Sequence, residues 1–234
     1  MYKNFRILAV VLARGGSKGI KLKNLKKIKN KTLVGHVGNF CEKIKIIDQA
    51  VISTDHIKIG NEGKKNGLDF FFIRPKNLSK DIVSDDDVIL HSLKKSEKYF
   101  KCKFDVIVSL PPTSPLRKKN TVIKAIKLLI DKKFDNVWSI SKTDSKFHPL
   151  KQLKLDHDKL KFYNKNGVKI ISRQQLNQVY FRNGSVYVIN RNSFLRDKKI
   201  FNDNTGYVID KSSQISIDTL EDIKLVKNYL KNTK

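Results

Sequence analysis

The chain has 234 residues, of which 39% are hydrophobic and 30% charged, a balance typical of one well-filled globular domain. Its apolar runs are far shorter than the roughly 20 residues of a membrane-spanning helix, and no cleavage pattern follows the N-terminal run. Two cysteines without a Cys-x-x-Cys pair predict no disulfide framework, and the histidines show no zinc-ligand spacing. We therefore expect a reducing, cytoplasmic setting.

The net charge of +27 raises the question of nucleic-acid binding. Only eight of the 49 basic residues are arginine, and no arginine stripe with interleaved aromatic residues is visible. The excess of lysine indicates a compositional bias at solvated positions, so we expect no nucleic-acid partner and no membrane partner. A non-catalytic basic protein that binds polyanions is the alternative interpretation of this charge.

Apolar strands alternate with amphipathic helices along the first 140 residues. Strands are expected at 6–13, 50–53, 69–73, 105–110 and 136–140. Helices are expected at 32–44, after a cap at Asp55, after a capping box at Ser84, and at 122–130. This alternation predicts an α/β fold with a mostly parallel sheet, in which ligands bind beyond the carboxyl ends of the strands.

The pattern changes in the last third of the chain. Residues 141–178 are polar and irregular, which predicts an inserted arm, a lid or an oligomer contact within one domain spanning 1–234. Strands are expected at 179–189, at 207–209 and at 215–217, and Thr219 and Asp222 predict the cap of a final helix.

The loop after the first strand is the richest in functional groups. It comprises Ala13, Arg14, Gly15, Gly16, Ser17, Lys18 and Gly19. Its glycines let the backbone approach a ligand, and its two cations and one hydroxyl predict a cradle for a polyphosphate, with Lys23 and Asn24 in reach. The loop also matches G-x-S-x-G, but a nucleophile elbow follows several strands, and only one strand precedes this loop. A plain glycine-rich turn is the remaining alternative, since the spacing is not that of a Walker A loop.

Polar residues also follow the other expected strands, and each has a structural alternative. Arg74 can reach a phosphate or a base edge, or lie at a surface turn. Ser84 and Asp85 can contact a nucleotide, or begin a capped helix. The loop from Pro111 to Arg117 suits the rim of a site for a polar anionic substrate, or a rigid connector.

Two further positions lie near the C-terminus, and the second of them allows two interpretations. Asn183-Gly184 is typical of a type I′ hairpin turn. Asp218 stands at the end of an expected strand, where a carboxylate can bind Mg²⁺ or take part in the helix cap.

Taken together and in order, these segments resemble the acylneuraminate cytidylyltransferases, the CMP-sialic-acid synthetases. The resemblance rests on AVVLARGGSKGIKLKN (9–24), VISTD (51–55), IRPKNLSKD (73–81), SDDDVILHSL (84–93), LPPTSPLR (110–117), RNGSVY (182–187) and IDTLED (217–222). It implies a three-layer, Rossmann-like fold of the nucleotide-diphospho-sugar transferase type. It also implies an enzyme that transfers CMP from CTP to the anomeric hydroxyl of a nine-carbon 2-keto acid sugar and releases pyrophosphate. Kdo cytidylyltransferases, which carry a different first loop, are the alternative.

The resemblance also implies roles for individual residues. Catalytic roles fall to Arg14, Lys18 and Lys23. Nucleotide contacts are implied for Leu12, Ala13, Arg14, Gly15, Gly16, Ser17, Lys18, Lys23, Asn24, Arg74, Ser84 and Asp85. Sugar contacts are implied for Pro111, Thr113, Ser114, Arg117, Arg182 and Asn183. Asp218 would bind Mg²⁺ as the cofactor, and residues 141–178 would form the arm of a homodimer.

Three positions depart from the family pattern. Pro111 stands where the family often has glutamine, and Phe181 stands where an arginine is frequent, with Arg182 one position later. These two changes leave the acceptor open among N-acetylneuraminate, legionaminate and pseudaminate. Gly19 favours the first two, because pseudaminate enzymes tend to show arginine there. Ser216 replaces the first aspartate of a common Asp-Ile-Asp motif, which leaves the metal geometry open.

Overall fold

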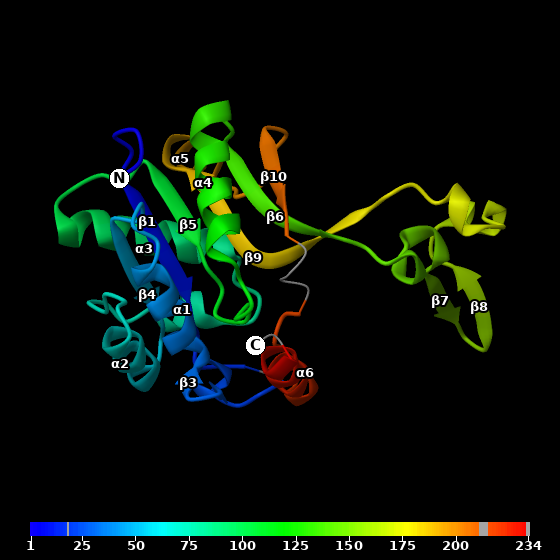
Figure 1. The fold of residues 1–234 in the computed structure, drawn as a ribbon, viewed down its shortest axis with the longest axis horizontal. Helices are drawn as coiled ribbons and strands as arrows, with labels where there is room; N and C mark the ends of the chain where they lie inside the picture. Colours follow the sequence, from blue (N-terminus) through cyan, green and yellow to red (C-terminus); the bar gives the residue numbers. More distant parts are fainter. Residues whose placement is uncertain (18, 211–214, 233–234) are drawn as a thin grey trace.

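In a computed structural model, which describes residues 1–17, 19–210 and 215–232, the first apolar run forms strand β1 (Ile7–Leu12). Among these residues, β1 belongs to a six-stranded sheet in the order β10-β6-β9-β5-β1-β4 (Figure 1). The other strands are β4 (Gln49–Ser53), β5 (Val106–Ser109), β6 (Asn136–Lys142), β9 (Tyr180–Asn190) and β10 (Thr205–Ile209). Strand β9 is antiparallel to both neighbours and the remaining pairs are parallel, which confirms a mostly parallel, mixed sheet.

Helices cover both faces of this sheet (Figure 1). On one face lie α1 (Leu33–Glu42), α2 (Ile57–Lys65) and α4 (Lys119–Lys132), and on the other α3 (Asp85–Phe100) and α5 (Arg191–Asp197). Strand β1 shows why: Ile7, Ala9 and Val11 pack on the first face. Leu8 and Val10 pack on the second. A strand buried on both sides has a continuous apolar sequence, and the predicted three-layer α/β fold is confirmed.

A third, smaller cluster holds the C-terminal helix α6 (Leu220–Asn232) against the short strand β2 (Lys27–Ile28), which pairs with β3 (Lys31–Thr32). The backbone N–H of Asp222 donates to Oγ1 of Thr219 at 3.2 Å. The Asp222 carboxylate in turn accepts from the N–H groups of Asp218 and Thr219. These bonds confirm the predicted cap and fix the backbone beside Asp218.

Residues 143–179 leave the sheet between β6 and β9 and project from the body as an arm (Figure 1). The arm contains a hairpin of β7 (Leu153–Asp156) and β8 (Lys159–Phe162) and short 3₁₀ turns. At its base, Nε2 of the buried His148 is 3.1 Å from the carbonyl oxygen of Asn177, and Nδ1 accepts from the N–H of Leu150. The sequence predicts an insertion here but not its hairpin, whose side chains are mostly exposed and show no burial pattern.

Two expected strands are absent from the part of the chain that the structure describes. Around 69–73, Asp69 makes only an isolated bridge to Val51, and the aromatic ring of Phe71 stacks on Tyr99 of α3 instead of extending a ladder. At 215–217, the N–H of Ile217 donates to the carbonyl of Thr113, a loop residue, so no sheet partner is available to it.

Two predicted local roles are also wrong. Asp55 does not cap α2, because its Oδ1 accepts the N–H of Gly15 at 2.7 Å. Asn183-Gly184 is not a hairpin turn but lies inside β9. Gly184 has a φ of +67°, and the register with β6 shifts between Trp138 and Ile140, which is the geometry of a β-bulge.

Candidate active site

A cavity of about 190 Å³ lies beyond the carboxyl ends of β1 and β5. It is lined by Leu12, Arg14, Gly16, Ser17, Lys23, Asn24, Asp85, Pro111, Pro112 and Thr113. All of these except Pro112 are among the contacts predicted from the sequence. Loops that are far apart in the chain therefore meet at the edge where α/β sheets bind ligands.

Two side chains fix the backbone of the first loop. Asn24, which is buried, donates from Nδ2 to the carbonyl oxygen of Arg14 at 2.9 Å. Asp55 accepts the N–H of Gly15. Gly19 lies so close to the C-terminal segment that a Cβ atom would stand 2.5 Å from the carbonyl oxygen of Asp218. Gly19 thus allows a close backbone approach, and the loop backbone is tied at Arg14 and Gly15.

Two of the predicted phosphate-binding cations are paired with carboxylates at this cavity. Nη1 of Arg14 is 2.5 Å from Oδ1 of Asp81, and Nζ of Lys23 is 2.8 Å from Oδ1 of Asp218. The sequence analysis missed Asp81, although it ends the segment IRPKNLSKD. Lys18 lies outside the described residues.

Arg74 is buried behind the first loop. It donates from Nε to Oγ of Ser53 at 3.1 Å and from Nη2 to the Ser53 carbonyl at 2.5 Å. Burial lowers the pKa of Arg74 to about 10, against the opposing effect of Asp55 and Asp85. The guanidinium therefore stays protonated at neutral pH, and it adds positive charge beside the cavity.

The start of α3 contributes a carboxylate to the cavity wall. Ser84 caps this helix, because its Oγ accepts the N–H of Asp87 at 3.2 Å. Asp85 follows and lines the cavity. Partial desolvation raises the pKa of the Asp85 carboxyl, while the charges of Arg74, Arg182 and Arg14 act in the opposite direction. The positive charge of the exposed Arg182 thus favours the ionised form of Asp85. The capping interpretation holds for Ser84, and its nucleotide contact stays a prediction.

Three of the predicted sugar contacts turn their polar groups inward. Oγ of Ser114 donates to the carbonyl of Gly184 at 2.9 Å. The amide of Asn183 donates to Oγ of Ser141 at 2.8 Å and accepts from Oγ of Ser139 at 2.6 Å. Arg117 binds the carbonyl groups of Pro111 and Ser185. These bonds build the wall of the site, whereas Pro111 and Thr113 line the cavity itself.

Asp218 is the candidate metal ligand. Its side chain is 69% exposed, and one of its oxygens accepts from Lys23. Within 1–17, 19–210 and 215–232, no group of three or more His, Cys, Asp or Glu residues is arranged to hold a metal ion. A single carboxylate is nevertheless a donor set that suits Mg²⁺, which commonly takes its other oxygen ligands from water and substrate phosphates.

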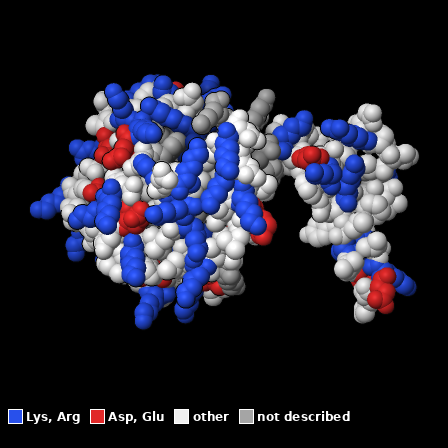
Figure 2. All heavy atoms as spheres, turned by 60° about the horizontal axis from the view of Figure 1, so that its bottom comes forward, with Lys and Arg blue, Asp and Glu red and all other residues white. Residues whose placement is uncertain are grey.

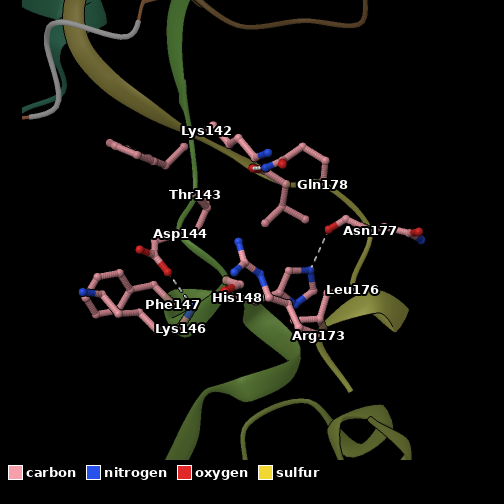
Figure 3. A pocket seen from close by; sticks show the side chains of 13 residues that line it. Lys142, Thr143, Asp144, Lys146, Phe147, His148, Arg173, Leu176, Asn177 and Gln178 are labelled. Atoms are coloured by element: carbon pink, nitrogen blue, oxygen red, sulfur yellow. Dashed lines mark hydrogen bonds between the residues drawn. The ribbon is translucent and has the colours of Figure 1, made fainter. Parts of the chain in front are cut away.

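A larger cavity of about 660 Å³ lies at the base of the arm and is separate from this site. Figure 3 shows its lining side chains, which include Lys142, Asp144, His148 and Arg173.

Lysine and arginine side chains cover much of the face of the body that Figure 2 shows. No helix in the described part of the chain has the length and apolar character to span a membrane.

Comparisons with known proteins show the family to which the chain belongs. The chain matches the family model of the cytidylyltransferases over residues 8–234. It is 32% identical over 226 residues to the post-translational flagellin modification protein B of Campylobacter coli, covering 96% of this chain and 95% of that protein. It is 31% identical over 222 residues to the CMP-N,N'-diacetyllegionaminic acid synthase of Campylobacter jejuni, covering 94% and 93%.

The fold is also found among solved structures. The structure of a CMP:2-keto-3-deoxy-manno-octonic acid synthetase complexed with CTP aligns with a TM-score of 0.72 at 13% identity, covering 98% of this chain and 100% of that one. At this identity the likeness shows the fold alone. From the family match over nearly its whole length, we conclude that the chain belongs to the cytidylyltransferase family of nucleotidyltransferases.

Proposed function

We propose that this chain transfers CMP from CTP to the anomeric hydroxyl of a nine-carbon 2-keto acid sugar and releases pyrophosphate. The observation that carries the proposal is the cavity beyond β1 and β5, where Arg14, Lys23 and the glycine-rich loop converge. The family match and the relative that is a CMP-legionaminic acid synthase support the same reaction.

Positioning and charge neutralisation account for the chemistry. The anomeric hydroxyl attacks the α-phosphorus of CTP in line and loses its proton to water, and the bond to the bridging oxygen of the leaving pyrophosphate breaks. Arg14, Lys18 and Lys23 are the residues that offset the charge developing on that pyrophosphate. The bonds of Asn24 to the Arg14 carbonyl and of Asp55 to the Gly15 N–H fix the backbone of the loop before CTP arrives, so little reorganisation is needed.

We further infer that the reaction uses Mg²⁺. When bound, the ion neutralises charge on the triphosphate and polarises the attacked phosphoryl group. Asp218 would hold it together with phosphate oxygens, and Lys23 would then exchange Asp218 for the triphosphate. Ser216 at the position of a second aspartate implies that this chain offers the ion a single carboxylate there.

The acceptor we favour is legionaminate or N-acetylneuraminate. Support comes from the relative named for legionaminic acid at 31% identity, whereas a pseudaminic acid cytidylyltransferase of Campylobacter jejuni is 25% identical. Pro111 has no side-chain donor, so it favours an acceptor whose contact at this point is apolar. Kdo is the alternative acceptor, for which the likeness in fold is the only support.

We also propose that the protein is a homodimer formed through the arm. The arm carries large apolar side chains in solvent: Leu155 is 79%, Leu160 67% and Ile171 92% exposed. Exposed apolar groups gathered in this way are typical of a protein contact, and a second copy of the chain is the partner we expect. Elution as a monomer at micromolar concentration would contradict this.

A cytoplasmic location is expected because the reaction consumes CTP and neither cysteine forms a disulfide.

The test is pyrophosphate release from CTP in the presence of a panel of sugars: N-acetylneuraminate, legionaminate, pseudaminate and Kdo. The proposal predicts release with at least one nine-carbon acid and little with Kdo. UTP in place of CTP is the matched control for the nucleotide. Release with Kdo alone would overturn the acceptor class, and stable binding of RNA without any turnover would favour the polyanion-binding alternative.

A further inference from the structure

The guanidinium of Arg117 lies behind the cavity wall rather than in the cavity. The residue is only 7% exposed and does not line the cavity that holds Arg14 and Lys23. Its Nη2 donates to the carbonyl of Pro111 at 2.6 Å, and its Nε donates to the carbonyl of Ser185 in β9. One side chain therefore joins the loop after β5 to the neighbouring strand.

The loop has a particular need for such a donor. Pro111, Pro112 and Pro115 fix backbone angles but offer no N–H to the surrounding structure. The loop is instead tied through its carbonyl groups and one hydroxyl. Thr113 accepts from the N–H of Ile217, and Ser114 donates to Gly184. Arg117 supplies the third tie, at the end of the loop that forms the cavity wall.

The charge of Arg117 survives its burial. Desolvation lowers the pKa of Arg117 to about 10, which still leaves the guanidinium protonated at neutral pH, and Asp210 acts to raise it. The ring of Phe40 lies 5.5 Å from the guanidinium carbon. Removing the guanidinium would take this donor from the buried carbonyl of Ser185 and would leave the partly buried carbonyl of Pro111 with the N–H of Ser114, a loss that an apolar replacement cannot repair.

We propose that Arg117 is a positioning residue that sets the loop from Pro111 to Thr113 against the bulge of β9, and so shapes the part of the site that receives the acceptor sugar. The kinetic part rests on the proposed function. The first loop, which receives CTP, is held separately by Asn24 and Asp55. Loss of Arg117 should therefore disturb use of the sugar far more than binding of CTP.

The experiment compares Arg117→Lys and Arg117→Met with two control variants, Arg191→Lys and Arg191→Met. Arg191 is the first residue of α5, directly after the other end of β9, and pairs with Glu97 at 2.7 Å, so its loss removes a partly buried arginine next to the same strand without touching the loop. Hydrogen exchange of the ligand-free proteins is measured first. Faster exchange is expected at 113–117 and 184–187 in the Arg117 variants and not in the Arg191 variants.

Steady-state kinetics of pyrophosphate release follow. Arg117→Met should raise the KM for the sugar at least about tenfold and leave the KM for CTP within about twofold, as expected when one wall of a site loses its fixed geometry. Arg117→Lys should lie between wild type and Arg117→Met, because one ammonium can reach one carbonyl but not span both. If Arg117→Met fails to fold, Arg117→Lys carries the same comparison.

Unchanged exchange in the loop of a folded Arg117 variant would overturn the inference, whatever the activity of the wild type. Equal rises in both KM values, or the same changes in the Arg191 variants, would also overturn it. Wild-type protein that releases no pyrophosphate with any sugar would instead contradict the proposed function, and the exchange data would still decide the role of Arg117.

Discussion

Nζ of Lys23 lies 2.8 Å from Oδ1 of Asp218, although 195 residues separate them in the chain. This contact joins the segment that follows the first loop to the segment that leads into α6. The pair of Arg14 and Asp81 makes a similar contact on the same cavity. Arg14 and Lys23, two of the cations that would meet a triphosphate, are thus already paired with carboxylates, which a bound nucleotide would have to replace.

Lys23→Ala should reduce kcat/KM for CTP by about 10²-fold, because it removes one preorganised charge from the leaving pyrophosphate. We expect a loss of the same order for Lys18→Ala. The measurement is the rate of pyrophosphate release, and Lys27→Ala, at the exposed residue of β2, is the control. Wild-type turnover in Lys23→Ala would remove this residue from the mechanism.

Asp81→Asn should lower the KM for CTP several-fold, because the Asp81 carboxylate competes with the triphosphate for Arg14. The matched control is Asp131→Asn, since Asp131 pairs with Lys3 at 2.8 Å and does not line the cavity. A KM for CTP that rises in Asp81→Asn would show that Asp81 supports binding of the nucleotide instead of competing with it.

Removal of divalent metal with EDTA should abolish turnover, and added Mg²⁺ should restore it. Asp218→Asn should shift half-maximal activity to a higher Mg²⁺ concentration, because a neutral amide is a weaker ligand for a hard cation. Titration of Mg²⁺ at saturating CTP measures this shift, with Glu221→Gln as the neighbouring control. Full activity without any divalent ion would contradict the role proposed for Asp218.

Asp85→Asn should raise the thermal stability of the free protein near neutral pH. Desolvation raises the folded-state pKa of Asp85, so the folded protein binds its proton more tightly than the unfolded chain. The stabilising effect of that proton is present at low pH and is lost as pH rises through the raised pKa. The advantage of Asp85→Asn over wild type should therefore shrink as pH falls toward about 4.

Asp222→Asn provides a control of opposite sign. N–H groups of Asp218 and Thr219 lower the pKa of the Asp222 carboxyl, so its contribution to stability is present near neutral pH and is lost as pH falls through the lowered pKa. Asp222→Asn should be less stable than wild type near neutral pH, with a difference that narrows in acid. Thermal unfolding across this pH range measures both variants, and parallel pH profiles would contradict the assignment of Asp85.

The sequence predicts the fold well where a strand is buried on both faces. The runs of β1 and β5 are continuous and apolar because helices cover both sides of the sheet, and their ends locate the site loops. The hairpin of the arm could not be predicted in this way, because the side chains of β7 and β8 are mostly exposed and their sequence shows no apolar periodicity. The hydrogen-bond partners of side chains also cannot be predicted from the spacing of apolar residues. Asp55 has the residue type and position of a helix cap, but its carboxylate accepts the N–H of Gly15 in the loop after β1.

The site could be predicted as a set of residues but not as a set of contacts. Arg74, Arg117 and Asn183 have the right chemistry to meet an anionic substrate, yet their described hydrogen bonds go to the protein. Which way a polar side chain turns depends on the carbonyl groups that tertiary structure leaves in need of a donor. Arg117 donates to a loop whose prolines have no N–H, and which carbonyl groups its guanidinium bonds is seen only in the folded structure.

The most direct test of the central claim is a crystal structure of the protein with CTP and magnesium. We expect the triphosphate against the backbone of Gly16 and Ser17, with Lys23 moved from Asp218 to a phosphate oxygen. Nucleotide bound elsewhere, with the first loop unoccupied and the pair of Lys23 and Asp218 intact, would contradict it.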